Sequence, residues 1–206
     1  MADSIIDRHE FAPFPKMPRL RRECIITEKI DGTNACVKIT ENGLLFAGSR
    51  SRWITPADDN FGFAKWVLEH RDELMQLGPG THFGEWWGSG IQRGYGLPKG
   101  EKRFSLFNTI RWCLASDEPQ LIPSADPRIE KYQERLPKCC GLVPVLSRGL
   151  FNTVLVDLCL RDLMECGSAA SPGFMKPEGV VCYHVAGNFG FKATIEKDEE
   201  PKGLRA

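Results

Sequence analysis

The sequence lacks an excess of either charge. Its 27 lysine and arginine residues balance 27 aspartate and glutamate residues, so the formal net charge at pH 7 is zero. Because 42% of the residues are hydrophobic, the chain is excluded from the highly charged disordered proteins. Neutrality also excludes a histone-like protein that coats nucleic acid along its whole surface, although it leaves room for a local basic cleft.

The sequence also lacks long apolar segments. No run approaches the roughly 18 apolar residues of a membrane span, and residues 1–20 contain no apolar core of a secretory signal. The 20 glycines follow no fixed period, which excludes a collagen-like chain. We therefore expect one globular domain over residues 1–206, located in the cytoplasm, neither secreted nor bound to a membrane.

The eight cysteines lack the spacing of a metal or redox site. No two of them form the Cys-x-x-Cys pair that a zinc ribbon or a dithiol redox centre requires. Several, such as Cys36 and Cys182, stand between apolar neighbours, where a free thiol packs as a small hydrophobic side chain. The cysteines therefore indicate a reducing compartment and buried free thiols.

Strand patterns dominate the chain. Short apolar or alternating runs bounded by turn residues predict strands at 24–27, 34–40, 44–47, 81–87, 103–112, 141–146, 179–184 and 189–194. Asn42-Gly43 is a strong signal for a two-residue hairpin turn. Because the hairpins are frequent and the helices few, the sequence predicts an α+β fold with mainly antiparallel sheets.

Two segments have the helical period instead. The first runs from Phe63 to Leu77, is capped by the group Asp58–Asn60 and is stopped by Gly78-Pro79. The second runs from Asn152 to Glu165, with Leu155, Leu158, Cys159 and Leu163 inward and Gly167 past its end. The stretch 115–140 is rich in proline and charge and is expected to cross the surface.

Lys29 is the first candidate for chemistry. It ends an expected strand and is followed by an Asp31-Gly32 turn, so its side chain is held at the edge of the sheet. A lysine attacks phosphorus or carbonyl carbon only as the free amine. On its own, however, the motif also fits a solvated lysine beside an ordinary turn, so the rest of the chain must decide.

Five later segments place further polar and aromatic residues at turns and in strands. In chain order they are Gly48–Arg52, His82–Gly88, Phe104–Phe107, Pro177–Val181 and Phe191–Thr194. In this order and at about this spacing, the six segments resemble motifs I, Ia, III, IIIa, IV and V of the covalent nucleotidyltransferases, the superfamily of ATP-dependent ligases and capping enzymes. The resemblance implies a ligase domain, ATP-grasp-like in layout, whose two antiparallel sheets are flanked by helices and hold the nucleotide in the cleft between them.

Within that superfamily the sequence is similar to the RNA ligase 2 type. Asn34 ends the first motif where DNA ligases have arginine, and the segment Gly84–Gln92 is similar to that branch's third motif and the loop after it. The resemblance implies an ATP-dependent RNA ligase that forms lysyl-AMP, transfers AMP to an RNA 5′-phosphate and joins that end to a 3′-hydroxyl. The resemblance does not decide whether these RNA ends lie at a nick in a duplex or are single-stranded.

The resemblance also implies catalytic roles. Lys29 would attack the α-phosphorus of ATP and become lysyl-AMP. Arg50 and Lys192 would hold oxygens of the α-phosphate and offset the charge that develops there. Asp31 would assist the departure of pyrophosphate. Glu178 would help to hold Mg²⁺ or Mn²⁺, since hard cations prefer oxygen ligands.

The remaining implied roles concern the nucleoside. Glu85 would bind the ribose hydroxyls, and Asn34 would form a hydrogen bond near the ribose. Phe107 would stack on adenine, while Glu28 lies where the family contacts the nucleoside.

Two departures from the family pattern bear on these roles. The second lysine of the fifth motif is replaced by Thr194, and we expect no appended OB or C-terminal helical domain. We therefore expect either a minimal ligase or a protein partner that supplies the missing nucleic-acid-binding domain. Five basic residues between positions 82 and 111 predict either a phosphate-tracking face or a solvated rim; they are Arg93, Lys99, Lys102, Arg103 and Arg111.

Two other functions remain open at this point. The first keeps the chemistry and changes the substrate, as in a DNA ligase or a capping-type nucleotidyltransferase. The second is a binding module that holds RNA ends without catalysis. Of the aromatic strand residues, at most one of Trp86 and Trp87 is expected to line the pocket, and His82 is expected to be structural.

Overall fold

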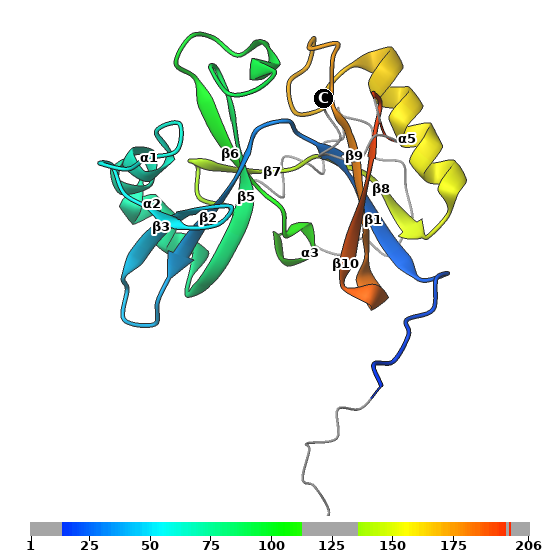
Figure 1. Ribbon diagram of the computed structural model, residues 1–206, viewed down its shortest axis with the longest axis horizontal. Helices are drawn as coiled ribbons and strands as arrows, with labels where there is room; N and C mark the ends of the chain where they lie inside the picture. Colours follow the sequence, from blue (N-terminus) through cyan, green and yellow to red (C-terminus); the bar gives the residue numbers. More distant parts are fainter. Residues whose placement is uncertain (1–13, 113–135, 197, 199–206) are drawn as a thin grey trace, which may run out of the picture.

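The computed structural model describes residues 14–112, 136–196 and 198, and these form two sheets that lie side by side (Figure 1). The first is fully antiparallel and contains, in spatial order, β10 (Phe189–Thr194), β9 (Gly179–His184), β1 (Glu23–Lys29) and β8 (Val145–Leu150). The second contains β4 (Trp53–Ile54), β3 (Leu45–Ser49), β2 (Thr33–Ile39), β5 (Gly80–Gly88), β6 (Lys102–Leu106) and β7 (Cys140–Leu142). Only its β6–β7 pair is parallel, so the predicted α+β fold with mainly antiparallel sheets is confirmed.

The first predicted helix is broken into three pieces. They are α1 (Phe63–Glu69), α2 (Arg71–Leu74) and the 3₁₀ turn η1 (Met75–Leu77). The break falls at His70, whose backbone leaves the helical region and whose ring Nδ1 lies 2.9 Å from the Trp66 carbonyl oxygen. The predicted cap is present, because the Asp59 carboxylate accepts hydrogen bonds from the Ala64 and Lys65 N–H groups.

The second predicted helix is α5 (Thr153–Cys166). The Asn152 side chain caps its first turn by accepting a hydrogen bond from the Val154 N–H, and Gly167 ends it at a positive φ of 83°. Cys159 and Leu163 pack against the four-stranded sheet as predicted. Leu158 was predicted to point inward but is exposed, because the packed stripe of this helix is narrow.

Two predicted strands end differently in the structure. The strand expected over 103–112 stops at Leu106, and α3 (Thr109–Trp112) follows because the Asn108 side chain accepts a hydrogen bond from the Arg111 N–H. The strand expected over 141–146 is split between the sheets, since Pro144 has no N–H to continue a ladder. Most of the predicted surface stretch 115–140 lies outside the described residues.

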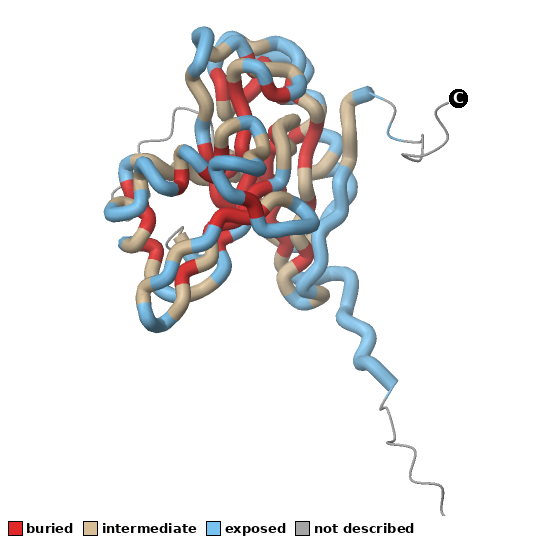
Figure 2. The backbone as a smooth tube through the Cα atoms, turned by 60° about the vertical axis from the view of Figure 1, so that its left-hand side comes forward, coloured by how far each residue is buried: buried red, intermediate tan, exposed pale blue. Residues whose placement is uncertain are grey.

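The core has three parts, and the buried segments gather toward the middle of the molecule (Figure 2). One lies between the six-stranded sheet and α1 and includes Trp86, and one lies between the four-stranded sheet and α5. The third, which includes Trp87 and Tyr95, lies where the two sheets meet. Both tryptophans of β5 are therefore core residues. No helix within the described ranges is long and apolar enough to cross a membrane.

The cysteines of the described part are all free thiols. Cys24, Cys36, Cys159 and Cys182 are buried as predicted, whereas Cys166 is exposed. Cys113 lies outside the described residues.

The chain crosses from one sheet to the other through residues 30–32, which join β1 to β2. Gly32 packs so closely on β5 that an added Cβ would lie 2.5 Å from the Trp86 carbonyl oxygen and 2.8 Å from the Trp87 Cβ. Backbone and buried tryptophan cannot easily move aside. A side chain at position 32 would therefore push the crossover away from β5.

We expect Gly32→Ala to lower the free energy of unfolding by roughly 1–3 kcal/mol, the usual range for overpacking a core. Gly190→Ala is the matched control, because its Cβ would meet only the Val181 Cγ1 at an ordinary 3.6 Å. Urea unfolding of both variants beside the wild type measures the difference. Equal midpoints for the two variants would show that the crossover is not tightly packed.

Candidate active site

A cavity of about 540 Å³ opens between the two sheets. Alternate residues of β1, namely Ile25, Thr27 and Lys29, form one wall. The facing wall comes from β2, β5 and the segment after β6, and includes Asn34, Glu85 and Phe107. This volume falls within the range of small-molecule sites, which are often found at such junctions.

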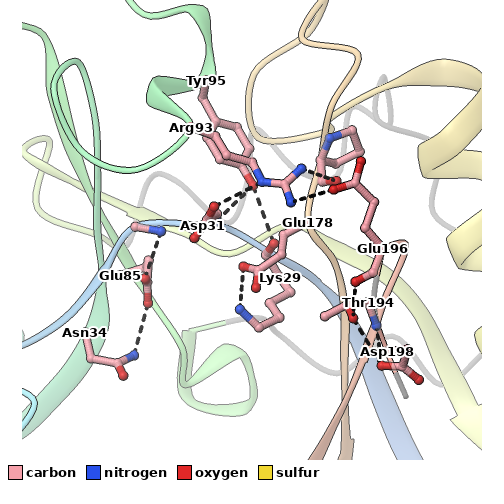
Figure 3. A network of polar contacts seen from close by, with 12 residues as sticks. Lys29, Asp31, Asn34, Glu85, Arg93, Tyr95, Glu178, Thr194, Glu196 and Asp198 are labelled. Carbon is pink, nitrogen blue, oxygen red and sulfur yellow. Dashed lines mark hydrogen bonds and ion pairs between the residues drawn. The ribbon is translucent and has the colours of Figure 1, made fainter. Parts of the chain in front are cut away.

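Lys29 and Glu178 form an ion pair at one end of this cavity (Figure 3). Lys29 is the last residue of β1 and pairs with Gly179, the first residue of β9, so the strand register brings Glu178 beside it. Both side chains are mostly buried. An amine and a carboxylate removed from water stabilise each other here, and both remain close to whatever enters the cavity.

Glu85 lies opposite this pair and is held by two hydrogen bonds. Its Oε1 accepts from the Gly32 N–H and its Oε2 accepts from Asn34 Nδ2, each at 3.1 Å. Asn34 and Glu85 are cross-strand partners on β2 and β5, which explains their contact. Burial raises the pKa of Glu85 from 4.5 to about 7, while the nearby Lys29 and the Gly32 N–H oppose that rise.

Arg93 braces three segments around the Lys29–Glu178 pair. Its Nε donates to Asp31 Oδ2 at 3.0 Å, and its Nη1 donates to the carbonyl oxygens of Lys176 and Pro177 at 3.1 and 3.4 Å. Its Nη2 lies 3.5 Å from Glu196 Oε2. The Arg93 guanidinium therefore links Asp31 to the segment that carries Glu178 (Figure 3).

Tyr95 adds a second contact from the same loop. Its hydroxyl accepts a hydrogen bond from the Asp31 N–H at 2.9 Å and lies 3.5 Å from the Lys29 carbonyl oxygen. Burial raises the pKa of Tyr95, so the hydroxyl keeps its proton. Sequence reasoning assigned no role to Tyr95 and placed Arg93 only among basic residues. The glycine-rich loop Gly88–Gly96 is the sequence feature that could have pointed to both residues.

Glu28 is among the residues that line the cavity, while its carboxylate is engaged by the loop after α5. Its carboxylate accepts hydrogen bonds from Ser168 Oγ at 2.6 Å and the Ala170 N–H at 2.8 Å, on the opposite side of β1. Burial raises its pKa, while the bond from Ser168 opposes the rise. The Glu28 side chain thus anchors the loop after α5.

Phe107 lines the cavity and keeps an exposed ring, as expected for a stacking residue. Its N–H donates to the Phe83 carbonyl oxygen at 3.0 Å, so the two phenylalanines are neighbours. Val181 of β9 lines the opposite wall. A flat apolar group could therefore lie between an aromatic ring and an aliphatic side chain.

Arg50 and Lys192 lie outside the cavity lining. Lys192 pairs with Val181, which places both residues on the cavity side of the four-stranded sheet, with Lys192 one strand further out. Arg50 is exposed in the turn between β3 and β4. The preceding Ser49 pairs with Ala35, beside Asn34, so this turn lies at the end of the sheet nearest the crossover. Thr194 occupies the position at which the fifth motif of the family has its second lysine. Its N–H donates a hydrogen bond to the Asp198 carboxylate.

Three of the five basic residues between positions 82 and 111 are engaged by neighbouring groups of the protein. Lys102 donates to the Phe61 carbonyl, Arg103 pairs with Glu101, and Arg111 donates to the Leu77 carbonyl. His82 is structural as predicted, since it is buried with its Nε2 2.9 Å from the Gly78 carbonyl oxygen.

A metal ion would find few protein ligands here. Residues 14–112, 136–196 and 198 contain no group of three or more histidine, cysteine, aspartate or glutamate side chains that could hold one. Glu178 offers one carboxylate beside the cavity. That donor set fits a hard cation such as Mg²⁺, which keeps several waters and takes other ligands from substrate phosphates.

Comparisons with known proteins agree with this geometry. Residues 22–195 match a family model described as RNA ligase. No curated protein gives a significant sequence match. Among solved structures, a lysine-to-methionine variant of Naegleria gruberi RNA ligase with AMP and Mn matches with a TM-score of 0.54 and 19% identity, over 85% of this chain and 50% of that one.

Two further structures of the Naegleria gruberi RNA ligase match in the same way. A variant with ATP and Mn has a TM-score of 0.53 and 17% identity over 85% of this chain, and a variant without ligand has 0.54 and 21% over 86%. In both cases 50% of the other chain is covered. The chain thus spans about half the length of these structures, and the likeness establishes a shared fold.

The raised pKa of Glu85 predicts a pH-dependent stability. Below about pH 4.5 the carboxyl is protonated in both the folded and the unfolded chain. As the pH rises toward 7, the unfolded chain loses this proton first, so the folded state loses stability until the folded group has also ionised. At about 1.4 kcal/mol per pKa unit, the shift from 4.5 to about 7 corresponds to a total loss on the order of 3–4 kcal/mol.

Glu85→Gln removes this titration. We expect the free energy of unfolding of the wild type to fall relative to that of Glu85→Gln between about pH 5 and pH 8. Urea titrations at both pH values measure this, with Glu69→Gln, on exposed α1 surface, as the control. A wild-type to Glu85→Gln difference that stays constant with pH would contradict the assigned pKa.

Proposed function

The chain belongs to the RNA ligase family, and from that premise we propose that it is an ATP-dependent RNA ligase that works through a lysyl-AMP intermediate. The observation that supports this most directly is that Lys29 lines the cavity between the sheets and forms an ion pair with Glu178 beside it. A lysine kept mostly out of water at the edge of a nucleotide-sized cavity is placed to attack a bound phosphate once its ion pair has opened and it has become the free amine.

The cavity walls suggest how ATP would lie. Adenine would stack on Phe107, with Val181 on its other face. The ribose hydroxyls would meet Glu85, whose carboxylate is an acceptor, with Asn34 beside it. The α-phosphate would then lie near Lys29.

Cationic side chains nearby support the placement of the phosphates. Lys192 lies on the cavity side of β10, next to Val181. Arg50 lies on the turn at the crossover end of the six-stranded sheet. Both side chains would need to reach inward to hold the α-phosphate oxygens and stabilise the charge that develops on them. Asp31, held by Arg93, lies where it could assist the departure of pyrophosphate.

The first step exchanges one bond at phosphorus for another. The lone pair of the Lys29 amine forms a P–N bond to the α-phosphorus, and the bond to pyrophosphate breaks. Lys29 must first leave its ion pair with Glu178 and give up a proton to water, and its nitrogen loses a second proton to water as the P–N bond forms. A bound Mg²⁺ or Mn²⁺ ion would supply charge neutralisation for the phosphates, with Glu178 as its protein ligand.

Two further transfers would complete ligation. The AMP group would move from Lys29 to the 5′-phosphate of an RNA end, which frees the amine. A 3′-hydroxyl would then attack that phosphate and release AMP, so a phosphodiester bond forms. The Naegleria gruberi RNA ligase structures that contain ATP or AMP together with Mn support this choice of cofactors.

We expect the wild-type chain to retain label after incubation with α-labelled ATP and Mg²⁺ or Mn²⁺, followed by denaturing electrophoresis. Lys29→Ala and Lys29→Arg should carry none, because neither has an amine to form the P–N bond. Lys29→Arg keeps a positive charge for Glu178 and so separates loss of the nucleophile from loss of the ion pair.

Lys65→Ala is the matched control, since Lys65 is an exposed lysine on α1 that pairs only loosely with Glu69, at 3.9 Å. It should be labelled like the wild type. Label on folded Lys29→Ala, or none on the folded wild type with either metal, would overturn the enzyme proposal and leave a binding module.

A further inference from the structure

An aromatic surface extends outward from the cavity across the six-stranded sheet. The strand register sets Trp53 opposite Gly48, Gly48 opposite Cys36, and Cys36 opposite Phe83. Phe83 is in turn hydrogen-bonded through its carbonyl to the Phe107 N–H. These residues therefore form one row that crosses β4, β3, β2 and β5 and ends at the cavity.

The rings of this row are exposed, unlike those on the other face of the same sheet. Trp53 is 57% exposed, Phe83 60% and Phe46, which contacts Trp53 at 5.9 Å between ring centroids, 43%. On the opposite face Trp86 and Phe104 are buried under α1. Exposed apolar surface gathered on one face generally marks a binding site. We call Phe46, Trp53 and Phe83 the aromatic platform.

Gly48 keeps the Trp53 ring against the sheet. A Cβ at position 48 would lie 3.1 Å from the ring carbon Cε3 of Trp53 and 2.7 Å from Cys36 Sγ. The indole therefore lies over β3 in the space that a side chain would fill, and its outer surface stays open. A ring held in place in this way loses little conformational entropy when a flat partner stacks on it.

The charges around the aromatic platform favour a polyanion. Lys38 pairs with Phe46 across the strands, and Arg50 follows β3 in the exposed turn next to Trp53. Among the strand residues described for this face of the sheet, Glu85 in the cavity is the only acid. Phosphate groups could therefore approach the rings without meeting carboxylates from these strands.

From this arrangement we propose that the aromatic platform stacks the unpaired bases of a single-stranded RNA end and leads that end to the cavity. The inference rests on the proposed function, whose substrate class it narrows. Bases in a duplex are stacked on one another, so exposed rings reach mainly bases that are unpaired. Trp53 and Phe83 are three strand spacings apart, about 14 Å, which is room for more than one base.

The test is binding of a fluorescently labelled, 5′-phosphorylated single-stranded RNA of on the order of ten nucleotides, without ATP, followed by anisotropy. We expect Trp53→Ala to weaken the affinity on the order of tenfold, the usual effect of losing one base-stacking ring. Trp53→Phe should stay close to the wild type, because it keeps an aromatic face. Phe189→Ala, which removes an equally exposed ring from β10, should bind like the wild type.

A fully paired nicked duplex of the same sequence separates stacking from attraction to phosphates. Its affinity should change little with Trp53→Ala. The aromatic platform would be overturned if Trp53→Ala bound single-stranded RNA as tightly as the wild type. It would also be overturned if Trp53→Ala lost as much affinity for the duplex as for the single strand, or if the wild type did not bind single-stranded RNA.

Labelling with α-labelled ATP, run on the same samples, keeps the two proposals separate. Trp53 is not a cavity residue, so Trp53→Ala should be labelled like the wild type. RNA binding that depends on Trp53 without any labelling of the wild type would support the platform and refute the enzyme. Labelling of the wild type without Trp53-dependent RNA binding would support the enzyme and refute the platform.

Discussion

The contact between Lys29 and Glu178 is the constraint on which the rest of the site depends. It joins the end of β1 to the start of β9 at the edge of the cavity, where neither charge is well solvated. Such a pair keeps its geometry only if both partners are held from outside. The surrounding contacts provide this support. Arg93 holds Asp31 and the two carbonyls before Glu178 from one side, and Glu28 anchors the loop after α5 from the other.

The same contacts explain how Lys29, the proposed nucleophile, can be held in place and still leave its ion pair with Glu178 when it reacts. The reacting side chains of an active site have to be held within a fraction of an ångström of their productive positions. Side chains that are fixed by a second layer of hydrogen bonds achieve this best. Tyr95 and Gly32 fix the crossover beside Lys29, since one bonds the Asp31 N–H and the other packs on β5 without a side chain. The ion pair itself stays accessible from the cavity, so a phosphate or a metal ion could compete for either partner.

The sequence predicted the sheets and most of the cavity, because strand alternation and short motifs are local signals. Lys29, Asn34, Glu85 and Phe107 do line one cavity, and Glu178 does lie beside Lys29. Contacts that depend on the register of distant strands could not be foreseen. The direction of the Glu28 carboxylate, the brace made by Arg93 and the row from Trp53 to Phe83 all belong to this class. The break at His70 was missed because the apolar period continues through it.

The measurement that tests the central claim most directly is peptide mapping by mass spectrometry after incubation with ATP and Mg²⁺ under acid-free conditions that preserve a P–N bond. The account predicts one AMP group, attached to Nζ of Lys29, which disappears when pyrophosphate is added back. An AMP group on another residue, or an unmodified Lys29 in a folded sample that binds ATP, would contradict it.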